Sequence, residues 1–409
     1  MNRLRKLVFS AGPRMAGARP LPMALTGAAA LLLAAVWLTV SLLASLPPGA
    51  GVSLPGAGAL HPAVSPQDAA ALPLSDLPPA AGVAAQAADR PVSTFSIVAY
   101  DPITGDLGVA VESKFFAVGP VVPFAAAGVG AIATQSYANT TYGPRGLQGL
   151  RDGDDPQQVL DELLAADPGR DRRQVGIVDA RGRTAAFTGT ACLAWAGSRS
   201  GPNYTVQGNI LAGPEVVDAM AAAFESTPGD LASRMVAALA AGQAAGGDAR
   251  GRQSAALLVV REGGGYGGYD DRLIDLRVDD HARPIEELQR LLDIWHGQRA
   301  ESEARHLLQS AAAGAGDAER AELLEQATAR AEAATRLYPG SGWAWLTLAE
   351  VHLAAGNPAD AATAGRRALR ADPWIKTAVL SGIQGSARLI EALLQDEAFR
   401  REWEAISSR

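Results

Sequence analysis

The sequence between residues 94 and 292 predicts an α+β domain built in layers. Eight apolar runs of strand length follow one another, and helical patterns stand in groups between them. This order favours layered sheets over a doubly wound parallel sheet, in which each strand is followed by its own helix. The predicted strands are Phe95–Ala99, Leu107–Val111, Gly128–Thr134, Gln174–Asp179, Thr184–Thr188, Thr205–Ile210, Ser254–Val260 and Leu273–Val278.

Three helices are predicted in the same part of the chain. Pro156–Ala166 and Gly229–Gly242 repeat apolar residues at the spacing of one helix face. Pro214–Ser226 opens with a proline, which suits the first turn of a helix because that position needs no backbone N–H donor. The helices therefore fall between groups of strands, which is typical of the α+β class.

A hairpin at the start of the domain carries candidate catalytic residues. The turn between its strands, at residues 101–106, contains the proline and the glycine that a tight turn needs. The first strand begins at the hydroxyl of Thr94, and the second returns Glu112, Ser113 and Lys114 toward it. As the only lysine of the domain, Lys114 could lower the pKa of the hydroxyl electrostatically. The alternative is a solvated lysine at the end of a strand.

Four polar side chains are candidates for substrate binding. Gln135 and Asn139 follow the third predicted strand, and Asn209 lies near the end of a later one. Their amides can donate hydrogen bonds to an oxyanion or to a substrate amide. Arg252 could bind a substrate carboxylate. The alternatives are turn formation by the asparagines and an ion pair between Arg252 and Asp248.

The composition argues against several function classes. The 409-residue chain has a net charge of -7 and a pI near 5.4, which argues against nucleic acid as a partner. Its single cysteine, Cys192, excludes an intramolecular disulfide and lies in an apolar run that favours a buried structural thiol. No histidine lies between Thr94 and Asp280, so a Ser-His-Asp triad would need His281 or a more distant histidine to reach back. The chain has no His-Glu-x-x-His motif, and we predict no metal and no cofactor.

A series of short segments matches a known family in order along residues 94–292. The segments are Val118–Pro123, Gly128–Ala131, Ala133–Gln135, Tyr142–Gly146, Gln207–Asn209, Gly251–Ser254 and Asp275–His281. Together they resemble the bacterial "domain of unknown function 1028" family, which has no settled activity. That family is regarded as having the fold of N-terminal nucleophile (Ntn) hydrolases. The resemblance therefore implies a four-layer αββα sandwich over residues 93–297.

The resemblance also implies a mechanism. In Ntn enzymes an N-terminal threonine attacks an amide carbonyl while its own α-amine, with a pKa of about 7.7–8.0, takes the proton. The lack of nearby histidines likewise leaves an amine or a lysine as the base. We therefore predict hydrolysis of a small amide or peptide bond, in a chain that is active only if it is cut before Thr94. The alternative is an ordinary threonine at a strand edge, in a non-catalytic module that binds a ligand or a peptide.

The first 92 residues predict a membrane anchor and a linker. Residues 1–20 carry five basic and no acidic side chains, and residues 21–46 form an apolar run without charges. As a helix this run spans about 39 Å, more than the ~30 Å hydrocarbon core. We therefore expect a single-pass signal anchor in the cell membrane, a cytoplasmic tail and the bulk of the chain outside, with cleavage near Ala44 or Ala50 as the alternative. Residues 47–92, rich in proline and alanine, form a spacer, and this location also suggests cell-wall peptides as substrates.

Residues 298–409 predict an all-α tail. An offset of 34 residues aligns Ala327 with Ala361 and Pro339 with Pro373, and this spacing resembles the tetratricopeptide repeat (TPR). Small alanines let paired helices pack closely, and each proline ends the second helix of a pair. Short arrays of this kind bind a peptide or another subunit, so we expect a protein partner. A purely structural appendage is the alternative.

Overall fold

The computed structural model describes residue 92 and residues 94–314, 316–381 and 387–406. It shows a mixed α/β domain followed by helices. Among the described residues no helix is long and apolar enough to cross a membrane. The longest helix, α7 (Pro284–Ala312), carries charged side chains along most of its length.

The predicted fold class is therefore corrected, because it included a transmembrane helix. The prediction of a membrane protein with a signal anchor is corrected for the same reason, since none of the described helices could span a membrane. The segment on which that prediction depended, residues 21–46, lies outside the described residues, as do the basic tail and all of the linker except Val92.

Two antiparallel sheets form the domain. The six-stranded sheet has the order β10-β9-β2-β1-β8-β7, and the four-stranded sheet has the order β3-β4-β5-β6. The strands are β1 (Thr94–Tyr100), β2 (Leu107–Ser113), β3 (Pro123–Ala126), β4 (Gly130–Ser136), β5 (Arg173–Asp179), β6 (Thr184–Thr188), β7 (Gly197–Gly201), β8 (Tyr204–Gly208), β9 (Ser254–Val260) and β10 (Arg272–Val278). The helices between them are α3 (Tyr142–Asp152), α4 (Pro156–Ala165), α5 (Glu215–Ser226) and α6 (Leu231–Ala244).

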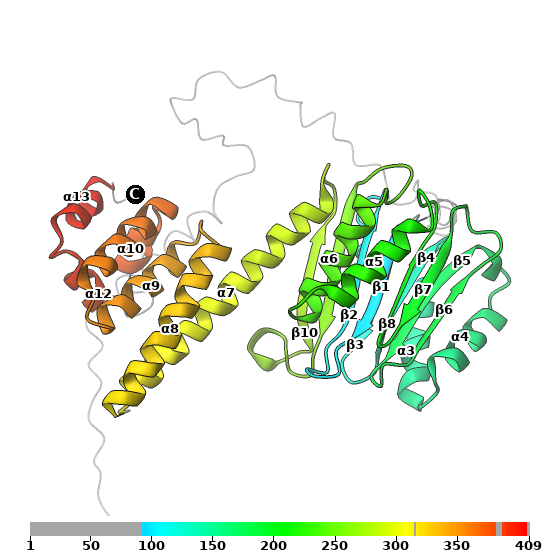
Figure 1. Cartoon of the computed structure of the whole chain (residues 1–409), viewed down its shortest axis with the longest axis horizontal. Coiled ribbons are helices and arrows are strands. Elements are labelled where there is room, and N and C mark those ends of the chain that lie inside the picture. The colour runs from blue at the N-terminus through cyan, green and yellow to red at the C-terminus, as the bar shows by residue number, and fades with distance from the viewer. Residues whose placement is uncertain (1–91, 93, 315, 382–386, 407–409) are drawn as a thin grey trace, which may run out of the picture. The chain divides into compact units, whose positions relative to one another are not determined.

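The two sheets are layered between helices, as Figure 1 shows. The space between the sheets is filled by small apolar side chains such as Val98, Val109 and Val178. On its other face the six-stranded sheet buries Phe95 and Ile97 against α5 and α6. Helices α3 and α4 cover the outer face of the four-stranded sheet. The order of the layers is therefore helix, sheet, sheet, helix.

The first hairpin forms where the sequence predicts it. Along β1, successive side chains point to opposite faces, so Phe95 and Ile97 enter the helix-facing core while Ser96 and Val98 face the second sheet. Gly105 provides the turn, because its φ of 78° is a conformation that residues with a side chain rarely adopt. The hairpin therefore brings the start of β1 beside the end of β2.

All eight predicted strands are present, but three elements of the domain were not predicted. Strand β3 has only four residues and starts at a proline, and β7 consists of small and polar residues. Helix α3 contains three glycines and a proline, which weaken a helical pattern. Its Gly143 is required by close packing, because a Cβ there would lie 2.2 Å from Cγ of Phe124. These elements form through tertiary contacts rather than local preference.

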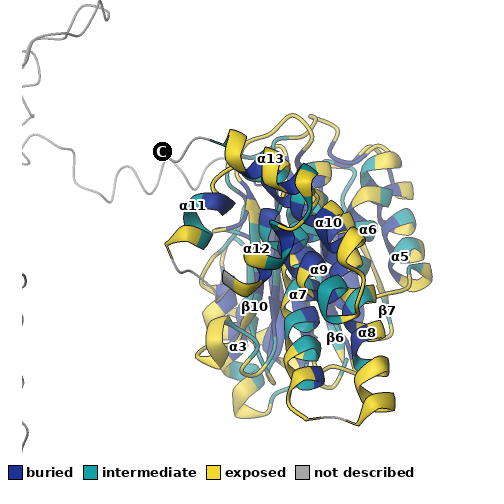
Figure 2. Cartoon of the chain, turned by 90° about the vertical axis from the view of Figure 1, so that its left-hand side faces the viewer, coloured by how far each residue is buried: buried dark blue, intermediate teal, exposed yellow. Residues whose placement is uncertain are grey.

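The helical part begins before the point that composition indicates. Helix α7 starts at Pro284 and packs Ile285 and Leu288 against the six-stranded sheet before continuing past residue 298. Ala327 and Ala361, which the 34-residue offset aligns, are both fully buried. Figure 2 shows α9 as a largely buried helix of this part. The helices after α7 are α8 (Asp317–Leu337), α9 (Gly342–Ala354), α10 (Pro358–Ala371), α11 (Ile375–Leu380), α12 (Ala387–Leu393) and α13 (Glu397–Ala405).

Candidate functional site

Thr94 and Ser113 lie side by side at one end of the six-stranded sheet. They are directly opposite each other in the pairing of β1 with β2, and both side chains are buried. Their hydroxyl oxygens are 3.2 Å apart, within hydrogen-bond distance. Thr94 Oγ1 also donates to the carbonyl oxygen of Val92, at 2.8 Å. A hydroxyl with a second hydroxyl beside it is therefore held at the start of β1.

Val92 closes this end of the site. Val92 forms a β-bridge with Ser136, in which the Val92 N–H donates to the Ser136 carbonyl at 2.5 Å and the Ser136 N–H donates back at 2.9 Å. Val92 is buried, and Thr94 has no exposed surface. In the uncut chain a substrate therefore has no access to the Thr94 hydroxyl.

A network of buried amides fixes the backbone of Thr94. The Thr94 carbonyl accepts from the Asn209 backbone N–H at 3.1 Å and from Gln135 Nε2 at 3.3 Å. Gln135 Nε2 and Asn209 Nδ2 both donate to Oε1 of Gln174, at 2.9 and 3.0 Å. Because these donors come from both sheets, the network holds the sheets together around Thr94.

Further members extend the network between the sheets. Ser96 Oγ donates to Gln135 Oε1 at 2.6 Å and accepts from Gln207 Nε2 at 2.6 Å. Gln207 Oε1 and Asn209 Oδ1 are buried acceptors for which no described residue supplies a donor. An acceptor on Asn209 is thus available near Thr94. Ser96, Gln174 and Gln207 were not predicted, although buried strands that carry polar residues at inward positions could have indicated them.

Glu112 faces away from Thr94. It follows Val111 and precedes Ser113 in β2, both of which point toward the second sheet, so its side chain points toward the helices. No described residue donates a hydrogen bond of ordinary geometry to either carboxylate oxygen. Burial raises the pKa of Glu112 well above its ordinary value and Asp248 adds to this, while Arg252 opposes it. Glu112 is therefore a buried carboxyl with a raised pKa, and it lies outside the Thr94 cluster.

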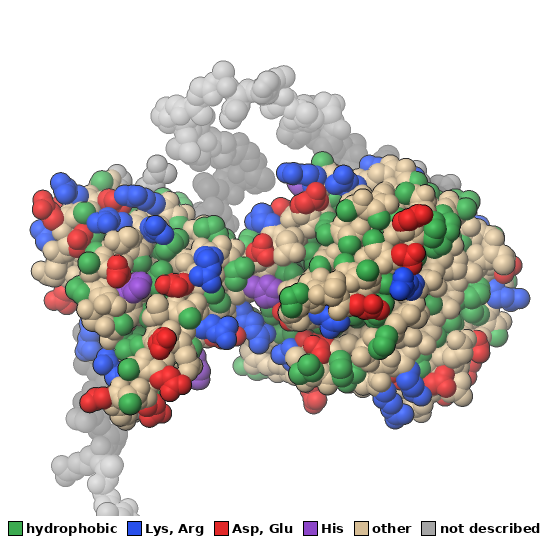
Figure 3. Space-filling view, viewed as in Figure 1, with side chains coloured by type: hydrophobic (Ala, Val, Ile, Leu, Met, Phe, Trp, Pro, Cys, Tyr) green, Lys and Arg blue, Asp and Glu red, His purple; other side chains and the backbone are tan. Residues whose placement is uncertain are grey.

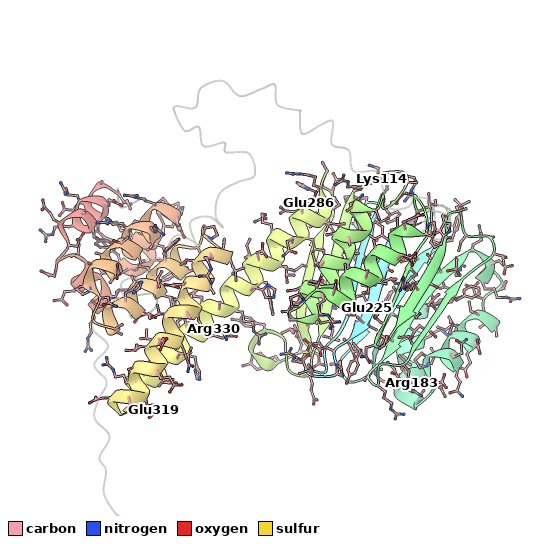
Figure 4. The ribbon with its side chains drawn as sticks, viewed as in Figure 1. Lys114, Arg183, Glu225, Glu286, Glu319 and Arg330 are labelled. Carbon is pink, nitrogen blue, oxygen red and sulfur yellow. The ribbon has the colours of Figure 1, made fainter. Side chains whose placement is uncertain are left out.

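Lys114 and Arg252 also lie away from the Thr94 hydroxyl. Lys114 Nζ donates to the carbonyl oxygen of Arg252 at 3.2 Å, and its side chain is exposed. Arg252 pairs with Glu286 at 3.4 Å, whereas Asp248 pairs with Arg250 at 2.7 Å. Lys114 and Glu286 are labelled at the same end of the domain in Figure 4. An ion pair of Arg252 with Asp248, the alternative to carboxylate binding, is not found among the described residues.

Asn139 belongs to a different cluster. Its Nδ2 donates to Asp167, which also accepts from the Tyr142 hydroxyl at 2.9 Å and from Arg173 at 2.8 Å. Burial alone would raise the pKa of Asp167, but the hydrogen bonds from Arg173 and Asn139 lower it well below its ordinary value. Burial and the Asp167 carboxylate together raise the pKa of Tyr142. These contacts give Asn139 a structural role.

The structure thus brings together some of the predicted site residues and separates others. Thr94, Ser113, Gln135 and Asn209 share one cluster, whereas Glu112, Lys114, Asn139 and Arg252 do not join it. The described residues contain no group of three or more His, Cys, Asp or Glu side chains that could hold a metal ion. What the cluster offers is a hydroxyl, a neighbouring hydroxyl and amide groups.

Comparison with known proteins identifies the family. The model of the "Family of unknown function (DUF1028)" matches residues 94–288. A crystal structure of protein SPO2555 from Silicibacter pomeroyi, described as family-model DUF1028, is 34% identical, with 49% of this chain and 88% of that chain covered and a TM-score of 0.45. The chain belongs to the DUF1028 family. None of the curated proteins matches it.

Proposed function

We propose that this protein is an Ntn-type hydrolase of amide or peptide bonds, with Thr94 as nucleophile, and that it becomes active only when the chain is cut before Thr94. The observation that supports this most is the position of the Thr94 hydroxyl, buried at the head of β1 beside Ser113 and covered by Val92. In a chain that is activated by cutting, we expect the nucleophilic hydroxyl to be positioned in advance but inaccessible to substrate, as the Thr94 hydroxyl is.

The chemistry follows from the α-amine that the cut creates. Thr94 Oγ1 attacks the amide carbonyl carbon of the substrate while the α-amine takes the hydroxyl proton. The C–N bond then breaks, and the amine passes that proton to the leaving nitrogen. Water hydrolyses the resulting ester, which restores the hydroxyl and releases the acid. An α-amine has a pKa of about 7.7–8.0, so a substantial fraction of it is unprotonated just above neutral pH and can accept a proton.

Two groups of the cluster support this role. The Ser113 hydroxyl, 3.2 Å from Thr94 Oγ1, can hold the nucleophile in place. Asn209 binds the Thr94 carbonyl through its backbone and keeps a side-chain oxygen that no described residue uses. That oxygen can accept a hydrogen bond from a protonated α-amine, which would stabilise the charge formed during attack.

The alternative is a non-catalytic module that binds a ligand or a peptide, with its helical tail recruiting a protein partner. Thr94 is completely buried in the uncut chain, so a chain that is never cut cannot use its hydroxyl for catalysis, which favours this alternative. Figure 3 shows acidic and basic side chains interspersed over the face in view, including the helical part. Such a mixed surface suits a protein partner better than nucleic acid.

The N-terminal sequence and the intact mass of the purified chain test the proposal. We expect a fragment that begins at Thr94, and we expect Thr94→Ala to abolish amide hydrolysis. Thr94→Ser keeps a hydroxyl and should retain hydrolysis. Thr104→Ala, in the exposed turn of the same hairpin, is the matched control and should behave as wild type. An uncut chain in which Thr94→Ala changes no property would refute the nucleophile and leave the binding module.

A further inference from the structure

Val92 occupies a place at the edge of β4 where a further strand could pair. Strand β3 pairs with β4 only as far as Ala133, whereas β4 continues to Ser136. Beyond β3, one edge of β4 therefore has room for another segment. Val92 takes this place and exchanges two backbone hydrogen bonds with Ser136, of 2.5 and 2.9 Å. Extended peptides bind to sheet edges in the same way, through backbone bonds of this kind.

The Val92 side chain fills an apolar position. It is 5% exposed and belongs to the same buried cluster between the sheets as Val118 and Val122. We call the Ser136 N–H and C=O, together with the buried apolar cluster that holds the Val92 side chain, the Val92 subsite. A charged side chain at this position would be strongly disfavoured, because burial removes it from water.

The Val92 subsite is aligned with the nucleophile. The carbonyl oxygen of Val92 accepts from Thr94 Oγ1 at 2.8 Å, and one residue separates Val92 from the bond that precedes Thr94. A residue bound here is therefore the second before that bond. When the cut segment leaves, the Ser136 N–H and C=O lose these partners and become available to another extended peptide.

We propose that the Val92 subsite binds the substrate of the cut enzyme, and that this substrate is an extended peptide with a small β-branched apolar residue two positions before the cleaved bond. This inference rests on the function proposed above and adds the substrate class. The segment before Thr94 is then bound in the manner of a substrate. Specificity arises from two features: the exchange of backbone hydrogen bonds with Ser136 and the exclusion of charge from the apolar position.

Three fluorogenic peptides test the inference on the wild-type protein after processing. They are acetyl-Val-Ser, acetyl-Asp-Ser and acetyl-(N-methyl)Val-Ser, each linked by an amide to aminomethylcoumarin. Hydrolysis transfers the acyl group to Thr94 Oγ1 and then to water, which releases the fluorescent amine. We expect kcat/KM for the valine peptide to exceed that for the aspartate peptide at least about a hundredfold, because the buried charge costs several kcal/mol. The N-methyl peptide, which cannot donate to the Ser136 carbonyl, should be about tenfold poorer.

Variants of the full chain provide a second readout. Val92→Asp should slow the appearance of the fragment that begins at Thr94, while Val92→Ile should leave it close to the wild-type rate. Thermal melting shows whether either variant folds, and the peptide measurements do not depend on these variants.

The outcomes separate the inference from the proposed function. If the chain is cut but the three peptides react at equal rates, or none reacts, the substrate class is wrong while the processing at Thr94 stands. If no cut before Thr94 occurs, both the proposed function and this inference are overturned. A preference for valine together with the penalty for N-methylation supports the inference.

Discussion

Replacing Gln174 by leucine tests the buried network that holds the two sheets around Thr94. Gln174 has no exposed surface, and its Nε2 lies 2.7 Å from the Gly208 carbonyl and 2.9 Å from Thr188 Oγ1. Its Oε1 accepts from Gln135 and Asn209. Leucine has a similar size, so Gln174→Leu removes these hydrogen bonds without leaving a large cavity.

The expected loss follows from the partners left behind. Asn209 Nδ2 and Thr188 Oγ1 make no other hydrogen bond among those found in the described residues, whereas Gln135 Nε2 keeps two further acceptors. Asn209 Nδ2 is buried and Thr188 Oγ1 is partly buried, so two groups without a partner, at about 1–3 kcal/mol each, predict a loss of about 2–6 kcal/mol. Because domains are stable by only about 5–15 kcal/mol, this loss is large.

The assay is urea unfolding followed by circular dichroism, with hydrogen exchange of the amides in β5 and β8. Gln148→Leu is the matched control, because Gln148 is exposed on α3 and bonds only to Asp152, at 2.8 Å. We expect the control to change stability by less than about 0.5 kcal/mol. If Gln174→Leu and Gln148→Leu unfold within about 1 kcal/mol of each other, the network does not hold the sheets together.

Three further predictions concern other buried groups. Burial holds the pKa of the Glu112 carboxyl well above its ordinary value of 4.5. The contribution of this carboxyl to the free energy of unfolding is therefore fully present below pH 4.5 and is lost as the pH rises through the raised pKa of the folded state. Glu112→Gln should therefore increase stability at pH 8 by about 1–3 kcal/mol, but little at pH 4, in urea titrations. Asp167, whose pKa is lowered from 3.8, stabilises above that pH and less as pH falls, so Asp167→Asn should cost about 3 kcal/mol at pH 7 and less at pH 3. Gly143→Ala should lower the melting temperature, since the new Cβ would overlap the ring of Phe124, at a cost of about 1–3 kcal/mol.

Each of these predictions has its own control or refuting outcome. A Glu112→Gln effect that is equal at pH 4 and pH 8 would show that folding does not raise the pKa of Glu112. If Asp167→Asn is as costly at pH 3 as at pH 7, ionisation of Asp167 does not contribute. For Gly143 the control is Gly316→Ala, where an added Cβ meets no atom within 4 Å, and melting should be nearly unchanged.

The pairing of Thr94 with Ser113 could be predicted because it is a local feature. Alternating apolar residues and the turn at residues 101–106 make a hairpin, and a hairpin of this length places its two ends together. The same alternation should have shown that Glu112 and Lys114 point away from Ser113, since successive side chains in a strand face opposite sides. Two of the four predicted catalytic residues therefore point away from the Thr94 hydroxyl, for a reason that was visible in the sequence.

The amide network could not be predicted from any local pattern. Gln135 and Gln174 lie in the four-stranded sheet, whereas Ser96 and Gln207 lie in the six-stranded sheet. Their contacts depend on how the two sheets are stacked, and no spacing along the chain encodes that distance. The separate Asp167 cluster that captures Asn139 likewise joins residues from distant segments.

The sequence by itself determined the strands, the first hairpin, the family resemblance and the candidate nucleophile, because each depends on residues close together along the chain. Only the tertiary structure decided which polar residues surround Thr94, and that Val92 covers it by pairing with Ser136. The physical reason is that hydrogen bonds and burial between sheets depend on packing across the whole domain. From the sequence we predict a cut before Thr94, and the structure shows Val92 paired with Ser136 and bonded to the Thr94 hydroxyl in the uncut chain.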